Sequence, residues 1–304
     1  MMYDLVIIGG GPAGLTAALY AGRSRLDILL IEKMAVGGRI LMSEIIENYP
    51  GFPGGISTTE LMSRMEAQVK ELGVKIVSEE VLDLDCVGKI IKTASGNYQA
   101  RSIIIASGAR PRKLNVPGEE KYTGRGVSYC ATCDAPFFKE KKVVVVGGGN
   151  AVAEEAIYLS RFANSVSVIH RRSDLRASPI LQERMQQNKK INFILNSVVT
   201  QIKGAAKVEA VVVKDLLSAK ESDFSCDGVF IYIGYEPETV FLKNKLQIDE
   251  AGFIVTDENM ATNSLGVFAC GDCRKKNFYQ VINACGDGAV AADSAYKFIA
   301  SKEK

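Results

Sequence analysis

Two cysteines separated by two residues are the side chains of this sequence best suited to chemistry. They lie in the segment Cys130-Ala131-Thr132-Cys133-Asp134, and this spacing lets both sulfurs form a small disulfide ring or lie together as a dithiol. Thiolate attack needs a lowered thiol pKa and an acid for the leaving sulfur, and Asp134 directly follows Cys133. We therefore predict a redox site with Cys130 and Cys133 as thiols and Asp134 as the acid.

The alternative for this motif is one half of a zinc site. A structural zinc normally takes a second Cys/His pair, whereas the only histidine of the chain, His170, ends a predicted strand elsewhere. Redox use is therefore favoured, although Asp134 could instead cap a helix. The single histidine also excludes a Ser-His-Asp triad or a multi-histidine metal centre unless partners supply residues.

The other five cysteines include a second pair at the same spacing. Cys270 and Cys273 flank Gly271 and Asp272, so a second dithiol is one interpretation. Cys270 also follows the apolar run 266–269, and we favour the alternative that it is a small buried strand residue. We predict structural roles for the isolated residues Cys86, Cys226 and Cys285.

The elements that must position this chemistry occur twice along the chain. An apolar strand at 5–8 leads into the turn Gly9–Gly14 and a helix-forming stretch, and a strand at 143–146 leads into the turn Gly147–Val152. Such turns need glycine where the chain bends sharply and where the backbone approaches a pyrophosphate, which then binds to the N–H groups that open the helix. The two turns therefore predict two dinucleotide sites.

The residue that ends the next strand distinguishes the two sites. Glu32 lies 18 residues after Gly14, where an acid hydrogen-bonds ribose hydroxyls and rejects a 2′-phosphate. His170 lies 18 residues after Val152 and is followed by cations that suit the 2′-phosphate of NADPH, namely Arg171, Arg172 and Arg176. The alternative is that these charges are simply solvated.

Two residues of the second turn need separate interpretation. Val152 replaces the small residue expected where the helix packs closely on the strand, which makes the second site the weaker prediction. Asn150 fits a turn or cap residue near the phosphate better than a catalytic one.

Composition sets the wider limits. A chain of 304 residues with 47% hydrophobic residues predicts about two globular domains. The 37 basic and 35 acidic residues leave no excess charge for nucleic acid, and no apolar run reaches the roughly 20 residues that span a bilayer. The N-terminus carries no cleavage-type segment, and seven cysteines are too few for a disulfide scaffold. We therefore expect a cytoplasmic protein.

Taken in order, these motifs resemble those of the low-molecular-weight thioredoxin reductases, and the resemblance runs essentially end to end. The segments that carry it are Gly9–Gly14, Glu47–Pro53, Ala106–Ala109, Cys130–Asp134, His170–Arg172 with Arg176, and Gly271–Asp272. Together they are far more specific than any one of them alone.

The resemblance implies an α/β fold with two Rossmann-like, three-layer dinucleotide-binding domains, the second inserted into the first. Residues 1–114 and 243–304 would form a discontinuous FAD-binding domain. Residues 115–242 would form an NADPH-binding domain that carries the CxxC. Pro-containing links near 114–117 and 236–239 would act as hinges, so that the domains rotate between half-reactions.

The resemblance also implies the cofactor-binding residues. For FAD they are Gly9, Gly11, Pro12, Ala13, Gly14, Glu32, Lys33, Gly38, Arg39, Asn48, Val81, Ala106, Ser107, Gly108, Gly271, Asp272, Gln280 and Val281. For NADPH they are Gly147, Gly149, Asn150, Ala151, His170, Arg171, Arg172 and Arg176. No metal is expected.

The implied reaction passes two electrons from NADPH through FAD to the disulfide by way of Cys133. Cys130 then attacks oxidised thioredoxin, Cys133 resolves the mixed disulfide, and Asp134 moves the proton. Family members are usually homodimers.

This chain departs from the family pattern at four places. Arg39 stands where a glutamine is common, Tyr279 where an arginine often precedes Gln280, and Ala135-Pro136 where a glycine often follows the aspartate. The fourth is that Cys270 and Cys273 flank Gly271-Asp272. These changes bear on the flavin potential, the rate of nicotinamide reduction and the protein partner.

Three alternatives remain open. The enzyme could serve another small redox protein, such as a glutaredoxin-like or peroxidase-coupled carrier. It could take electrons from NADH, ferredoxin or another donor, which Val152 leaves possible. It could also be a flavin-binding redox sensor whose CxxC only switches conformation. A ferredoxin–NADP reductase would share the architecture but lack the pair Cys130 and Cys133.

Overall fold

The computed structural model describes residues 2–42, 45–46 and 48–302. The chain divides into two compact units. The first unit combines Met1–Arg110 with Glu236–Lys304, and the second unit is Pro111–Tyr235. The segments that join the units, β9 (Ala109–Pro111) and β18 (Tyr235–Pro237), pair with each other as a two-stranded ribbon. Both units have the mixed α/β architecture predicted from the sequence.

The first unit is built on a seven-stranded sheet with the order β5-β2-β1-β8-β7-β6, in which β19 also pairs with β8. Its parallel strands are β1 (Met2–Ile8), β2 (Ile28–Glu32), β5 (Lys75–Ser78), β8 (Gly96–Ile105) and β19 (Val267–Ala269). An antiparallel extension is formed by β6 (Val81–Asp85) and β7 (Ile90–Thr93). The C-terminal strand β19 thus completes a sheet begun by the N-terminal half of the chain.

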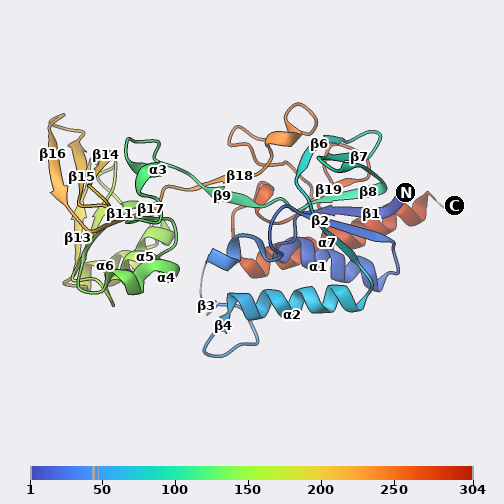
Figure 1. Cartoon of the computed structure of the whole chain (residues 1–304), viewed down its shortest axis with the longest axis horizontal. Coiled ribbons are helices and arrows are strands. Elements are labelled where there is room, and N and C mark those ends of the chain that lie inside the picture. The colour runs from blue at the N-terminus through green and yellow to red at the C-terminus, as the bar shows by residue number, and fades with distance from the viewer. Residues whose placement is uncertain (1, 43–44, 47, 303–304) are drawn as a thin grey trace. The chain divides into compact units, whose positions relative to one another are not determined.

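Helices cover one face of this sheet (Figure 1). They are α1 (Pro12–Arg23), α2 (Thr58–Glu71) and α7 (Val281–Ser301), with the short 3-10 turns η1 (Gly38–Met42) and η4 (Gly271–Cys273). The 3-10 turn η3 (Val240–Leu242) lies on the other face, next to β6. Small buried residues of α1 and α7, including Ala17, Ala18, Ala291 and Ala292, let these two helices pack closely. A separate apolar cluster on the other face packs β6, β7 and residues 241–254 against the sheet. A two-stranded ribbon, β3 (Ile45–Ile46) with β4 (Ile56–Ser57), precedes α2.

The first Gly-rich turn forms because only glycine fits its crowded backbone. Gly9 has a φ of +107°, and a Cβ there would lie 2.3 Å from the carbonyl oxygen of Ala106. A Cβ on Gly14 would lie 1.9 Å from the carbonyl oxygen of Gly9, so α1 approaches the turn as closely as backbone allows. Pro12, with its fixed φ, starts the helix.

The second unit repeats this plan around a five-stranded parallel sheet with the order β10-β17-β11-β12-β13. The strands are β10 (Val127–Ser128), β11 (Lys142–Gly147), β12 (Ser165–Ile169), β13 (Ile191–Ile194) and β17 (Gly228–Tyr232). One face is covered by α4 (Ala131–Asp134), η2 (Ala135–Phe138), α5 (Asn150–Leu159) and α6 (Pro179–Gln187). The other face carries the antiparallel sheet of β14 (Ser197–Lys203), β15 (Ala210–Asp215) and β16 (Glu221–Ser225), with α3 (Glu119–Tyr122) nearby (Figure 1).

Val152 occupies the third position of the second Gly-rich turn without breaking the unit. Its side chain is buried, and its Cγ2 lies 2.7 Å from where a Cβ on Gly147 would be. The valine therefore fills space that Gly147 leaves free, and it joins the core that α5 shares with the sheet. Within the described ranges, no helix is both long and apolar enough to cross a membrane.

Candidate active site

Segments far apart in sequence meet at the Gly-rich turn of the first unit. A Cβ on Gly38 would lie 3.2 Å from the Cα of Gly11, and a Cβ on Gly271 would lie 2.7 Å from the Cβ of Ala13. The η1 and η4 turns therefore flank the start of α1 from two sides. This places five predicted FAD-binding positions, Gly11, Pro12, Ala13, Gly38 and Gly271, within one short stretch of surface.

Glu32 ends β2 beside the same turn. One carboxylate oxygen accepts a hydrogen bond from the Gly10 N–H at 2.7 Å, and the other accepts one from the Met34 N–H at 3.0 Å. These bonds hold the carboxylate at the edge of an open cavity. Further predicted cofactor residues line that cavity, namely Gly9, Lys33, Val81 and Ser107.

The shape and chemistry of this region fit a flavin dinucleotide. The Gly-rich turn leaves free the space that Cβ atoms would fill, at the start of a helix. The Glu32 carboxylate lies beside it, where it can accept hydrogen bonds from ribose hydroxyls. Ala106, Ser107 and Gly108 directly follow β8, and Ala106 lies next to Gly9 of the turn. The first unit thus offers the pyrophosphate and ribose contacts that FAD needs.

A second group of predicted residues lies around the start of α7. Asn48 Nδ2 donates a hydrogen bond to Gln280 Oε1 at 3.1 Å, and Gln280 directly precedes Val281, the first residue of α7. Arg39 Nη2 lies 2.9 Å from Asp272 Oδ2. Tyr279 packs on the ring of Phe253, with 5.6 Å between ring centroids, and Lys276 Nζ lies 5.4 Å from its ring.

Asp272 belongs to a larger charged cluster that the sequence reasoning missed. Lys276 Nζ lies 3.1 Å from Asp272 and 3.3 Å from Asp287, and Arg274 also pairs with Asp287 at 3.3 Å. The Gly271 N–H donates to Asp287 at 3.2 Å. The signal that could have revealed the cluster is Asp287 itself, a charged residue on the apolar, buried face of α7. The cluster fixes the turn that holds Gly271 and Asp272.

In the second unit, the Gly-rich turn opens onto a cavity of its own. Predicted NADPH residues line it, namely Gly149, Asn150, Ala151 and Arg176, together with Tyr129, Tyr232 and Tyr235. Asn150 Oδ1 accepts a hydrogen bond from the Ser178 N–H at 2.7 Å, which ties the turn to the start of α6. Asn150 therefore acts on the backbone, as expected for a turn residue.

His170 directly follows β12 and is not among the residues that line this cavity. Its ring is buried against Gly148, where a Cβ would come within 2.3 Å of the ring. Burial lowers the pKa of His170, and the nearby charges of Arg176, Arg171 and Arg172 lower it further, whereas a hydrogen bond that the imidazole donates to the Asp174 backbone raises it. The imidazole is therefore neutral at pH 7, and the three arginines supply the positive charge around it.

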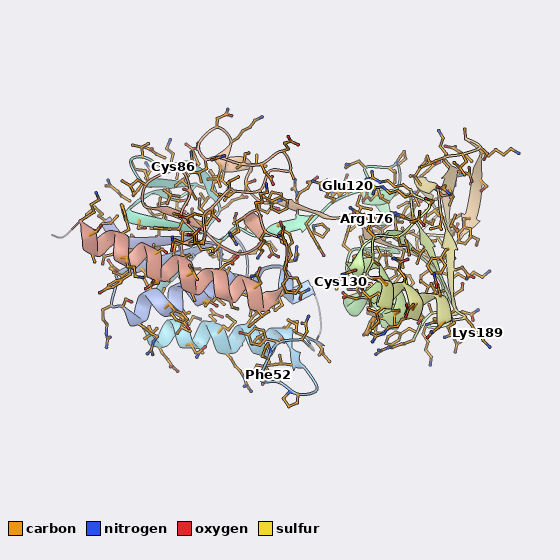
Figure 2. All side chains as sticks on the ribbon, turned by 180° about the vertical axis from the view of Figure 1, so that it is seen from behind. Phe52, Cys86, Glu120, Cys130, Arg176 and Lys189 are labelled. Carbon is orange, nitrogen blue, oxygen red and sulfur yellow. The ribbon has the colours of Figure 1, made fainter. Side chains whose placement is uncertain are left out.

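The redox motif follows β10 directly. Cys130 is half-buried and disulfide-bonded, and it lies at the start of α4 (Figure 2). The side chain of Cys133 lies outside the part of the chain that the structure describes. Cys130 N–H donates to Ser128 Oγ at 3.0 Å, and Cys130 O accepts from Asp134 N–H at 3.3 Å. Asp134 precedes η2, and its carboxylate makes no capping hydrogen bond. A disulfide at Cys130 favours redox use of this motif over a zinc site.

Tyr232 and Glu155 are two further residues that the sequence reasoning missed. The hydroxyl of the half-buried Tyr232 accepts a hydrogen bond from the Ala131 N–H at 2.6 Å. Glu155 Oε2 is buried without a hydrogen-bond partner among the described residues, and desolvation followed by the charge of Glu154 raises the Glu155 pKa to about 7. For Tyr232, the only available signal was a tyrosine at the end of an otherwise apolar strand.

The remaining cysteines are all buried and free. Cys270 and Cys273 are fully buried, and Cys273 Sγ donates to the carbonyl oxygens of Cys270 and Ile105. The second CxxC is therefore not a disulfide in this structure, and Cys270 and Cys273 belong to two different apolar clusters of the first unit. Cys86, Cys226 and Cys285 are likewise buried side chains.

Two dinucleotide-binding folds in one chain, one of which carries a disulfide, define a nucleotide-dependent disulfide oxidoreductase. Residues 3–288 match the family described as pyridine nucleotide-disulphide oxidoreductase, and the chain belongs to that family. It is 45% identical to the thioredoxin reductase of Peptoclostridium acidaminophilum, over 98% of this chain and 97% of that protein. It is 44% identical to the thioredoxin reductase of Bacillus subtilis, over 98% and 95%.

Solved structures agree with this assignment. The crystal structure of Lactococcus lactis thioredoxin reductase in its FR conformation superimposes with a TM-score of 0.90 at 46% identity. That match covers 98% of this chain and 99% of the other. The sequence-based prediction of the family and of the two-Rossmann fold is therefore confirmed.

Proposed function

We propose that the protein is an NADPH-dependent flavoenzyme that reduces the disulfide of thioredoxin. The observation that carries this proposal is the disulfide at Cys130, in the same unit as a nucleotide cavity lined by Gly149, Asn150 and Arg176. The names of the similar proteins support thioredoxin as the substrate.

FAD is assigned to the first unit. The turn at Gly9–Gly14 would hold the pyrophosphate at the start of α1, Glu32 the adenosine ribose, and Asp272 the polar chain next to the flavin ring. Asn48, Gln280 and Arg39 would surround the ring itself. FAD bound in this way supplies two-electron transfer between a nicotinamide and a disulfide.

NADPH is assigned to the second unit. Gly149, Asn150 and Ala151 would hold its pyrophosphate at the start of α5. Arg171, Arg172 and Arg176 would bind the 2′-phosphate, because guanidinium groups bind phosphate oxygens with paired, charge-assisted hydrogen bonds. The neutral, buried His170, which directly precedes Arg171, would anchor this arginine segment against Gly148.

The thiol chemistry belongs to Cys130, Cys133 and Asp134. Two electrons and two protons convert the disulfide into two thiols. The Cys130 thiolate then attacks one sulfur of oxidised thioredoxin and forms a mixed disulfide, and one thioredoxin sulfur leaves as a thiolate. Cys133 attacks Cys130 Sγ, which restores the enzyme disulfide and releases reduced thioredoxin. Asp134 would donate and take back the proton at the leaving sulfur.

The remaining assignments follow from the family. We propose a homodimer acting in the cytoplasm, with the two domains, residues 1–114 with 243–304 and residues 115–242, rotating between half-reactions. A second small redox protein as substrate, or a donor other than NADPH, remains the main alternative for the same disulfide chemistry.

Steady-state turnover tests the proposal. The purified FAD-loaded protein should oxidise NADPH continuously only when oxidised thioredoxin is present, and Cys130→Ser should abolish this turnover while NADPH still bleaches the flavin absorbance. Turnover by Cys130→Ser at the wild-type rate would contradict the assignment. Equal turnover with NADH would instead show that the enzyme is not specific for NADPH, which is the alternative named above.

A further inference from the structure

Tyr232 touches two functional parts of the second unit at once. Its hydroxyl accepts the hydrogen bond from the Ala131 N–H, the first peptide group after Cys130, at 2.6 Å. The same residue lines the cavity that also exposes Gly149, Asn150 and Arg176. It ends β17, whose neighbour β11 leads into the Gly-rich turn.

The surroundings of the Tyr232 hydroxyl keep it neutral, so that it can accept the hydrogen bond from the Ala131 N–H. The side chain is half-buried in the wall of the cavity, and desolvation first, then the charge of Glu155, raises its pKa well above the usual value. Tyr235 and Asp134 are the other titratable groups that face it. Tyr232 is therefore a neutral acceptor for Ala131. A buried N–H without an acceptor is costly, so the ring cannot shift without affecting the peptide that follows Cys130.

We propose that Tyr232 is a positioning residue that couples occupancy of the nucleotide cavity to the redox state of the Cys130 disulfide. A nucleotide in the cavity contacts the Tyr232 ring, and its effect passes through the hydroxyl to the Ala131 peptide. By linkage, reduction of the disulfide must change nucleotide affinity by the same factor. This coupling rests on the proposed nucleotide site.

The expected direction of a Tyr232 substitution follows from the Ala131 N–H. In Tyr232→Phe this N–H loses its acceptor next to the disulfide. After reduction, the Cys130 sulfur carries more negative charge and can partly replace the lost acceptor. The substitution therefore favours the dithiol over the disulfide, by about fivefold in the exchange equilibrium if one ordinary hydrogen bond is at stake.

Thiol–disulfide equilibration tests the proposal. The FAD-loaded protein is equilibrated anaerobically with dithiothreitol, which becomes its cyclic disulfide as the enzyme disulfide becomes two thiols. Acid quenching, alkylation and mass spectrometry of the Cys130 peptide then give the reduced fraction, with and without saturating NADP+. Calorimetry measures NADP+ binding separately. The matched control is Tyr122→Phe, which removes a hydroxyl from the same unit outside the cavity lining, one that donates to the carbonyl oxygen of Gly204.

We expect NADP+ to shift the wild-type and Tyr122→Phe equilibria at least about threefold. Tyr232→Phe should favour the dithiol and show no NADP+ shift while still binding NADP+. A Tyr232→Phe equilibrium that equals wild type, or that shifts with NADP+ as wild type does, would overturn the proposal. NADP+ that binds to wild type without shifting its equilibrium would overturn the coupling but leave the proposed function intact. Absence of NADP+ binding to wild type would overturn both.

Discussion

Arg39 Nη2 lies 2.9 Å from Asp272 Oδ2 and links two turns that are 233 residues apart in sequence. Arg39 is one of the four departures from the family pattern, and the ion pair explains how the larger, charged side chain is accommodated. Asp272 keeps a second cation, Lys276, at 3.1 Å, and that lysine is the more deeply buried partner. Arg39 therefore adds to an existing cluster rather than creating one.

Arg39→Gln should consequently be tolerated, whereas Asp272→Ala should not. Arg39 is 31% exposed, so the loss of its ion pair should lower the free energy of unfolding by less than about 1 kcal/mol. Asp272→Ala removes a partner of the buried Lys276, and we expect a loss of about 3 kcal/mol and weaker FAD binding. Urea unfolding and release of fluorescent FAD measure both effects. The control is Arg64→Gln, which breaks an exposed pair with Glu60 on α2. Equal losses for Arg39→Gln and Asp272→Ala would show that Arg39 is the essential partner.

The arginine cluster at the second site predicts a selective loss of NADPH affinity. Arg171→Ala with Arg172→Ala should raise the KM for NADPH at least about tenfold and the KM for NADH little, because only NADPH carries the 2′-phosphate. Adding Arg176→Ala should extend the effect, since Arg176 lines the cavity. Initial rates with each nucleotide give the comparison. If both KM values rose equally, the 2′-phosphate assignment would be wrong.

Glu155 predicts an unusual pH dependence of stability. Burial holds its pKa at about 7 in the folded protein against an ordinary value of 4.5. The folded state therefore keeps a proton that the unfolded state loses, and stability falls as the pH rises from about 4.5 to 7. Glu155→Gln removes this cost. The change in the free energy of unfolding that it causes should therefore be more stabilising at pH 8 than at pH 5, by about 3 kcal/mol at most.

Urea unfolding at the two pH values measures the Glu155 effect. Glu183→Gln, an exposed carboxylate on α6, is the control and should behave alike at both values. An effect of Glu155→Gln that does not depend on pH would mean that this carboxyl is ionised in the folded protein.

Phe137 predicts where the protein substrate docks. It lies on η2, directly after the redox helix, and is 72% exposed, which is unusual for a large aromatic side chain. Phe137→Ala should raise the KM for thioredoxin about tenfold without changing the KM for NADPH or turnover of a small disulfide. Leu217→Ala, an apolar side chain that is 80% exposed on the β15–β16 turn, is the matched control. A similar KM change in both variants would remove Phe137 from the docking surface.

Local patterns in the sequence were sufficient to predict the elements that hold the nucleotide turns. The apolar runs at 5–8 and 143–146 lie within β1 and β11, and the helices begin at Pro12 and Asn150 as the glycine turns require. These features depend on residues that are neighbours in the chain. The strand-end residues Glu32 and His170 were found for the same reason, since each lies at a constant distance from its turn.

The contacts that complete the sites could not be predicted in this way. Tyr232 and Ala131 are 101 residues apart, and nothing in either segment signals their hydrogen bond. The ion pair of Arg39 with Asp272 likewise joins residues that are far apart in sequence. The sequence places His170 at the predicted nucleotide site, but the packing of its ring against Gly148 could not be predicted, because it depends on the tertiary fold.

The central claim is that electrons from NADPH reach the Cys130 disulfide. The most direct measurement adds excess NADPH to the FAD-loaded protein without oxygen, quenches it in acid, and follows alkylation of the Cys130 peptide by mass spectrometry. We predict that Cys130 changes from disulfide to alkylated thiol, and that NADH at the same concentration reduces it far more slowly. A flavin that loses its absorbance while Cys130 stays in the disulfide would contradict the account.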